Sequence, residues 1–153
     1  MKSGKVPVNV LKRSVLRQLK NKRSEIANSA DLGADCAIFE PLPEGQMVTC
    51  VQEGVVELCC ENDLAEAEKE DPSVMPMRRL FQKCANNLAV AGAEPVAAEL
   101  VIFLPESVEE PELKALMAEA EGAAAEINVQ IIGGQTRVSS AVRQPLATVT
   151  GYG

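Results

Sequence analysis

The feature that most constrains the fold is an amphipathic helix pattern followed directly by a strand pattern, between residues 77 and 104. Apolar side chains recur at spacings of three and four, at Met77, Leu80, Phe81, Cys84, Leu88 and Ala91. This spacing places them on one side of a helix, and Gly92 follows where a C-terminal cap is common. The apolar run Val96–Leu104 then predicts a strand. A helix with one apolar side next to such a strand predicts a sheet on which helices pack.

The rest of the chain extends this pattern. Pro111 opens a second helix, because proline favours the first helical turn; its apolar side is Leu113, Leu116, Met117, Ala120, Ala124 and Ile127. Strands are expected at 36–39, about 47–51, 129–132 and about 144–150, with a Gly133-Gly134 turn after the third. Residues 55–60 fit a strand or the start of a helix, and 61–76, which contain two prolines, predict a loop. We therefore predict an α+β fold, a mixed sheet with two long helices on one face.

The first 25 residues form a basic arm. Eight of the 15 Lys and Arg side chains lie there with Glu25 as the single acidic one, so the other 128 residues carry 7 basic and 21 acidic side chains, a net charge of −14. Such an arm could contact nucleic acid or an acidic partner. The alternative is a short helix that buries Leu11, Val15, Leu16 and Leu19 and is solvated outside or docked on the acidic body.

We favour the helix, and do not expect nucleic acid binding, because no aromatic side chains lie between the basic ones. At 153 residues the chain has room for one domain with its own core. We therefore divide it into a basic helical arm, residues 1–25, and a single domain, residues 26–153.

Several classes of site are excluded by the residue types. The chain has no histidine, and its five cysteines show no Cys-x-x-Cys spacing; they are Cys36, Cys50, Cys59, Cys60 and Cys84. We expect no zinc site and no catalytic group built on histidine, and we expect buried free thiols instead. No apolar run reaches the roughly 20 residues that span a bilayer, and the start lacks the apolar stretch of a signal peptide. We expect no membrane association and a cytoplasmic location.

Two short motifs point to a known family. Residues 86–95 read Asn-Asn-Leu-Ala-Val-Ala-Gly-Ala-Glu-Pro, and residues 129–138 read Val-Gln-Ile-Ile-Gly-Gly-Gln-Thr-Arg-Val. Together with Gly33-Ala34-Asp35 before the first strand, they resemble the N-terminal domain of the aminoimidazole ribonucleotide (AIR) synthetase superfamily, the PurM-like proteins. Thiamine-monophosphate kinase, selenophosphate synthetase and a hydrogenase maturation protein belong to it. The resemblance covers residues 33–153.

The resemblance implies a domain that dimerises by joining two sheets into a barrel and binds ATP along the assembly. The cofactor-binding candidates that it implies are Asp35, Asn87, Gly133, Gly134, Gln135 and Thr136. The partner would be a second copy of the chain or a full-length relative. Full-length members also carry a C-terminal α/β domain, which would begin where this sequence ends, at Gly153.

The chain departs from the family at three positions. There the family has acidic side chains that bring Mg²⁺ to the nucleotide phosphates, and here Gln52, Asn87 and Gln135 stand in their places. Asp35 is retained, and Glu53 lies one residue off. Because Mg²⁺ prefers carboxylate and phosphate oxygens, an amide is a poor anchor. We therefore assign no metal site and no catalytic residue.

Each candidate also has a simpler role. Asp35 can hydrogen-bond its own backbone in a turn, and the two glycines can form a sharp turn rather than a phosphate cradle. Asn87 and Gln135 can bind a ribose or base, or satisfy buried backbone groups.

Two functions remain open on these residues. One is a catalytically inactive subunit that serves binding or assembly. The other is an ATP-dependent enzyme half, for phosphoryl transfer or for ATP-driven dehydration or cyclisation, which a partner chain completes around Asp35 and Glu53.

Overall fold

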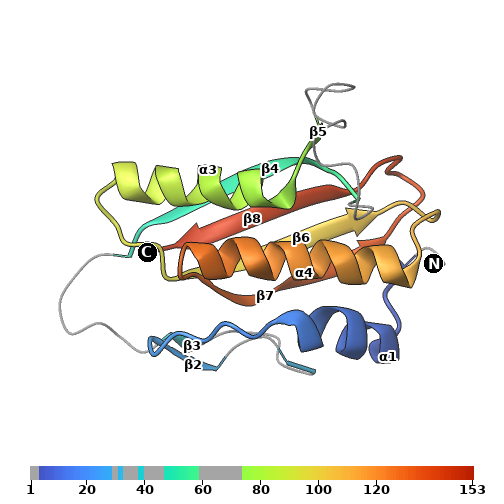
Figure 1. Ribbon diagram of the computed structural model, residues 1–153, viewed down its shortest axis with the longest axis horizontal. Coiled ribbons are helices and arrows are strands. Elements are labelled where there is room, and N and C mark those ends of the chain that lie inside the picture. The colour runs from blue at the N-terminus through green and yellow to red at the C-terminus, as the bar shows by residue number, and fades with distance from the viewer. Residues whose placement is uncertain (1–3, 29–30, 33–37, 40–46, 59–73) are drawn as a thin grey trace.

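The computed structural model describes residues 4–28, 31–32, 38–39, 47–58 and 74–153. In these residues a six-stranded sheet has the order β1-β7-β6-β8-β4-β5 (Figure 1). The four long strands are β4 (Thr49–Val56), β6 (Ala97–Leu104), β7 (Gln130–Val138) and β8 (Leu146–Tyr152), and the two short edge strands are β1 (Gly4–Lys5) and β5 (Val74–Met75). β6 and β7 are parallel, whereas β8 is antiparallel to both β6 and β4. The predicted mixed sheet of an α+β fold is confirmed.

Two long helices cover one face of this sheet, α3 (Met77–Val90) and α4 (Glu110–Glu126) (Figure 1). Both predicted helices are confirmed. The left-handed φ of 82° at Gly92 follows the end of α3, as expected of a C-terminal glycine. A capping box starts α4: the Glu109 side chain accepts a backbone N–H, and the Glu112 side chain accepts the Glu109 N–H at 2.7 Å.

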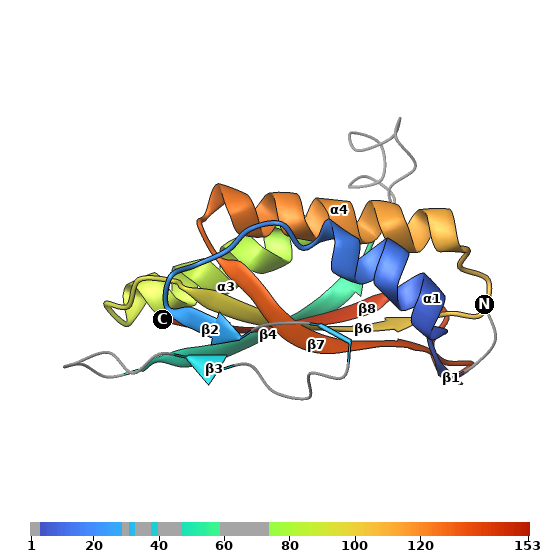
Figure 2. The ribbon, with the colours of Figure 1, turned by 90° about the horizontal axis from the view of Figure 1, so that it is seen from below.

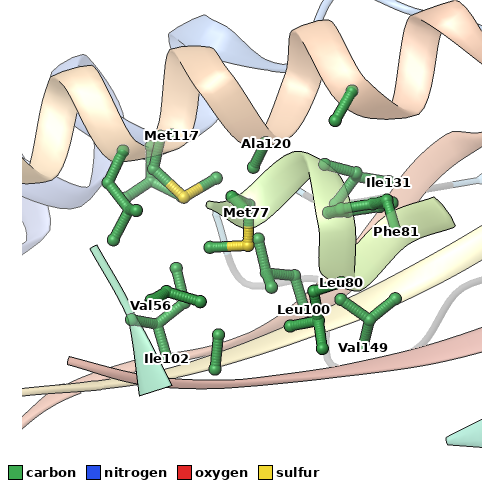
Figure 3. Close-up of a cluster of buried hydrophobic side chains, with 14 of the residues drawn as sticks. Val56, Met77, Leu80, Phe81, Leu100, Ile102, Met117, Ala120, Ile131 and Val149 are labelled. Carbon is green, nitrogen blue, oxygen red and sulfur yellow. The ribbon is translucent and has the colours of Figure 1, made fainter. Parts of the chain in front are cut away.

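The core lies between the two helices and the sheet (Figure 3). Side chains alternate along each strand, so Leu100, Ile102 and Leu104 of β6 are buried toward the helices. The side chains between them point to the other side. We call the face of the sheet opposite α3 and α4 the open face.

The basic arm lies along α4 (Figure 2). It consists of α1 (Val8–Val10), a π-helical turn η1 (Leu11–Val15) and a 3₁₀ turn η2 (Leu16–Gln18), and a two-stranded sheet follows from β2 (Ile26–Asn28) and β3 (Ile38–Phe39). Val15 is buried, and Leu11 and Leu19 pack against the core, whereas Leu16 is not among the residues that do. The arm is therefore built of short helical turns at residues 8–18 and packs against α4 and the core.

Polar contacts hold the arm in place. Arg13 pairs with Glu110 of α4, and the Ser14 hydroxyl donates to the same carboxylate at 2.8 Å. Further along, the backbone N–H groups of Lys20 and Asn21 donate to Glu121. Arg23 of the arm also pairs with Glu94 at 3.5 Å, so the basic arm meets the acidic body through two glutamates of α4 and a third beyond α3.

The Glu110 contacts predict a pH dependence. The hydrogen bond from Arg13, and then that from Ser14, lower the pKa of Glu110 from 4.5 to about 2. Because the folded-state pKa lies below the unfolded one, the ionised carboxylate stabilises the fold above about pH 4.5, and this stabilisation is lost as the pH falls toward about 2. Glu110→Gln should therefore lower the unfolding temperature at neutral pH and converge with the wild type in acid. Thermal unfolding of both proteins across this range tests it; a difference that is constant with pH contradicts it.

Several predicted boundaries were wrong. The strand expected at about 47–51 is β4, which runs longer, from Thr49 through Val56, so the strand alternative holds at residues 55 and 56, whereas residues 59–60 lie outside the described residues. The predicted turn at Gly133-Gly134 is instead part of β7, because β6 pairs with this strand as far as Val138; the register shifts at Ile132, and both glycines then pair with β6. The last strand begins and ends two residues later than expected. Residues 36–37 and most of the predicted loop, 61–73, lie outside the described residues.

None of the helices in the described part of the chain is long and apolar enough to cross a membrane.

Candidate functional site

The glycine pair of the second motif lies in the middle of β7, where this strand and β6 change register. Gly134 has a φ of 136°, and a Cβ atom there would lie 1.9 Å from the carbonyl oxygen of Leu100. Only a residue without a side chain allows the two backbones this approach. Gly133, by contrast, has open space where its Cβ would stand. The structure thus gives Gly134 a role in strand pairing that needs no ligand.

The two residues after the glycines point to opposite faces of the sheet. Thr136 pairs with Ile102 and is buried on the helix side, whereas Gln135 pairs with Val101 and is exposed on the open face. The Gln135 Nε2 group donates to the carbonyl oxygen of Thr136 at 3.4 Å. Its amide nitrogen therefore takes part in a local backbone contact.

The other two amides belong to the helix side. Asn87 is exposed in the last turn of α3. Gln52 shares its side of β4 with Cys50, whose sulfur contacts Cys84 of α3, and its Nε2 group donates to the Val51 carbonyl at 2.8 Å. Within one chain, the structure separates Gln52 and Asn87 from Gln135 by the thickness of the sheet. Asp35 lies outside the described residues.

The open face has polar and apolar side chains in rows across the strands. Strand pairing places Gln135, Val101, Thr148 and Glu53 in one row, Glu99, Thr150 and Val51 in a second, and Arg137, Phe103, Leu146 and Val55 in a third. The rows run across the long strands of the sheet and mix hydrogen-bonding side chains with apolar ones. Such a surface suits contact with another protein surface better than it suits a small metal ion.

One hydrogen bond on this face was not foreseen from the sequence. The Tyr152 hydroxyl donates to Glu99 Oε2 at 3.1 Å. Burial, and then the charge of Glu99, raise the pKa of Tyr152. The signal that would have found the pair is Glu99 as the single polar residue within the apolar run of β6, together with the polar residues at every second position of β8. Among the described residues, no group of three or more His, Cys, Asp or Glu side chains is placed to hold a metal ion.

A narrow apolar pocket lies beneath α3, with an empty volume of about 200 Å³ that includes open solvent. Phe81, Cys84 and Leu88 of the helix line it, together with Val149 and Gly151 of β8. Because no charged side chain lines this pocket, it does not suit nucleotide phosphates.

The sequence and the fold of this chain resemble those of known proteins. The family described as AIR synthase related protein, N-terminal domain, matches residues 33–153. No curated protein sequence matches the chain.

Solved structures share the fold. The hydrogenase maturation protein HypE in complex with ATP has a TM-score of 0.68 at 18% identity, over 95% of this chain and 38% of that one. Thiamine-monophosphate kinase from Stenotrophomonas maltophilia has a TM-score of 0.62 at 19% identity, and the match covers 98% of this chain and 43% of the kinase chain. A chain of a HypE-HypF complex has a TM-score of 0.56 at 20% identity, and the match covers 73% of this chain and 34% of that one. The chain spans about two fifths of the first two structures, and at these identities the likeness concerns the fold.

Proposed function

This chain belongs to the AIR synthase related protein family by its N-terminal domain, and from that premise we propose that it is a binding or assembly subunit that has lost magnesium-dependent ATP chemistry. The resemblance drawn from the two motifs is confirmed by the family match. The loss of magnesium-dependent ATP chemistry is our proposal, and it is supported by the amide side chains at the expected metal-binding positions.

The observation that carries the proposal is the set of three amides. Gln52, Asn87 and Gln135 stand where the family resemblance implies carboxylates, and a neutral amide holds Mg²⁺ poorly. Phosphoryl transfer depends on a metal that neutralises phosphate charge. The residues do not fit a bound magnesium ion, so we derive no reaction through one.

We further propose that the open face is where the chain associates, with a second copy or with a full-length relative. Val51 is 56% exposed on this face, and Val101, Phe103 and Leu146 are half-buried beside it. Apolar side chains in such rows are favourable to cover with a second sheet. A HypE-HypF complex is among the structures of similar fold. This supports the proposal that the present chain also associates with another chain.

The competing function is an ATP-dependent enzyme half. Its support is Glu53, which is exposed on the open face, where a partner chain would complete a site, and the ATP bound to the HypE structure of similar fold. Asp35 would be the second carboxylate of that site.

Calorimetric titration of the purified chain with ATP, with and without Mg²⁺, tests the proposal. We expect no binding that Mg²⁺ strengthens and no ATP turnover, because the amides supply no charge to hold the metal. Micromolar binding that strengthens with Mg²⁺ would contradict the proposal. If Asp35→Asn then abolished that binding and Asn87→Ala did not, the retained carboxylate would carry the site and the enzyme half would be the correct function.

A further inference from the structure

Two cysteines from different layers of the fold lie in contact. Cys50 belongs to β4 and Cys84 to α3, and their Sγ atoms are 3.2 Å apart. The Cys50 Sγ atom also lies 3.3 Å from the carbonyl oxygen of Cys84. A disulfide bond is about 2.05 Å long, so the sulfurs need to approach by only about 1 Å. We propose that Cys50 and Cys84 form a peroxide-reactive dithiol site that closes into a disulfide between the sheet and the helix.

The surroundings leave room for this bond. Gly151 of β8 pairs with Cys50, and a Cβ atom on Gly151 would lie 2.5 Å from the Cys84 sulfur and 3.7 Å from the Cys50 sulfur. The absence of a side chain there lets the two thiols meet above the sheet. In the described part of the chain, β5 pairs with β4 only at Val55 and Val56, so the Cys50 end of β4 is an edge of the sheet.

The two sulfurs differ in access. Cys50 is partly exposed, whereas Cys84 is only 3% exposed. Burial, and then the contact with Cys50, raise the pKa of Cys84 to about 12. Cys84 therefore keeps its proton at neutral pH. Since the thiolate is the nucleophile, Cys50 is the sulfur that reacts with an oxidant first.

With hydrogen peroxide as the oxidant, the steps balance as follows. The Cys50 thiolate attacks one peroxide oxygen, so that an S–O bond forms, the O–O bond breaks, and hydroxide leaves and is protonated to water. Cys84 then attacks the sulfur of this sulfenic acid. The S–S bond forms, the S–O bond breaks, and the departing hydroxide takes the Cys84 proton as a second water. The two thiols lose two electrons, and one peroxide gains them.

The bond would connect two segments of the candidate site. Asn87 lies three residues after Cys84 on α3, and Gln52 lies two residues after Cys50 on β4. Oxidation would therefore fix the helix end that carries one amide to the strand that carries another. The inference stands on the thiol geometry and holds whether or not the proposed function is correct.

The test uses the full chain with Cys36→Ser, Cys59→Ser and Cys60→Ser, so that only the pair remains. After peroxide and then alkylation, we expect a monomer lighter by two hydrogen atoms that takes no alkyl group, and whose thiols return with dithiothreitol. The closed loop should raise the unfolding temperature by roughly 10 °C.

The same treatment of that chain with a further Cys84→Ala should give no such gain in temperature. Two alkylated thiols after peroxide, a covalent dimer, or a sulfinic acid on Cys50 would overturn the proposal. Should the triple variant fail to fold, peptide mapping of the oxidised wild type decides the matter, because a linked Cys50 and Cys84 peptide is expected and its absence contradicts the pair.

Discussion

Replacing Gly134 by alanine is expected to destabilise the chain by about 3 kcal/mol or more, a large share of the 5 to 15 kcal/mol typical of a domain. The new Cβ atom would lie 1.9 Å from the carbonyl oxygen of Leu100, 2.5 Å from its carbonyl carbon and 2.8 Å from its nitrogen. These are backbone atoms of β6, so relief requires the two strands to separate. The φ of 136° adds strain of its own. Urea unfolding followed by circular dichroism measures the loss.

The neighbouring glycine supplies a matched control. A Cβ atom on Gly133 would meet nothing within 4 Å, so Gly133→Ala should change the free energy of unfolding by less than about 1 kcal/mol. Equal losses in the two variants would show that the close strand approach does not govern stability. If only Gly134→Ala lowers the free energy of unfolding, strand pairing would explain why glycine stands at position 134, without any role in binding ATP.

On the proposal that two copies associate through the open face, a charge on this face should separate them. Val51 is 56% exposed there and Val90 is 90% exposed on the outer side of α3. In a dimer that covers the open face, Val51→Glu buries a carboxylate from each copy, which costs several kcal/mol and weakens association by about a hundredfold or more. Val90→Glu adds the same charge outside the proposed interface.

Sedimentation or light scattering measures the outcome. We expect twice the chain mass of 16.3 kDa for the wild type and for Val90→Glu, and the single-chain mass for Val51→Glu. A wild-type chain that is monomeric at all concentrations would refute self-association through this face and leave a full-length relative as the partner. Dissociation of both variants would place the interface elsewhere.

The helices were predictable because the residues that define the buried side and the end of each helix lie close together in the sequence. Met77, Leu80 and Phe81 set the buried side of α3 within one turn, and Gly92 marks its end. The glycines of β7 were misread for a related reason. Two glycines after an apolar run are typical of a turn, and only the pairing with β6, which is distant in sequence, keeps the strand continuous.

The candidate site was predictable in residue type but not in position. The two motifs identified Asn87 and Gln135 as amides in places that the family gives to acids. Which face of the sheet Gln135 occupies depends on the register shift between β6 and β7. One residue of shift reverses the face of every later side chain. The contact between Cys50 and Cys84 depends likewise on packing across 34 residues.

The place of β8 in the sheet bears on how the protein is made. β8 lies between β6 and β4, although it is the last strand of the chain. Among the residues that the structure describes, β4 pairs along most of its length only with β8, so during synthesis this pairing waits until Leu146–Tyr152 has left the ribosome. The basic arm also docks late in synthesis, because Arg13 and Lys20 contact residues that lie about 100 positions later in the chain. Contacts this distant form slowly. The sheet is therefore completed only after residues 146–152 have emerged, and a nascent chain that stalls earlier would display an unjoined strand open to aggregation.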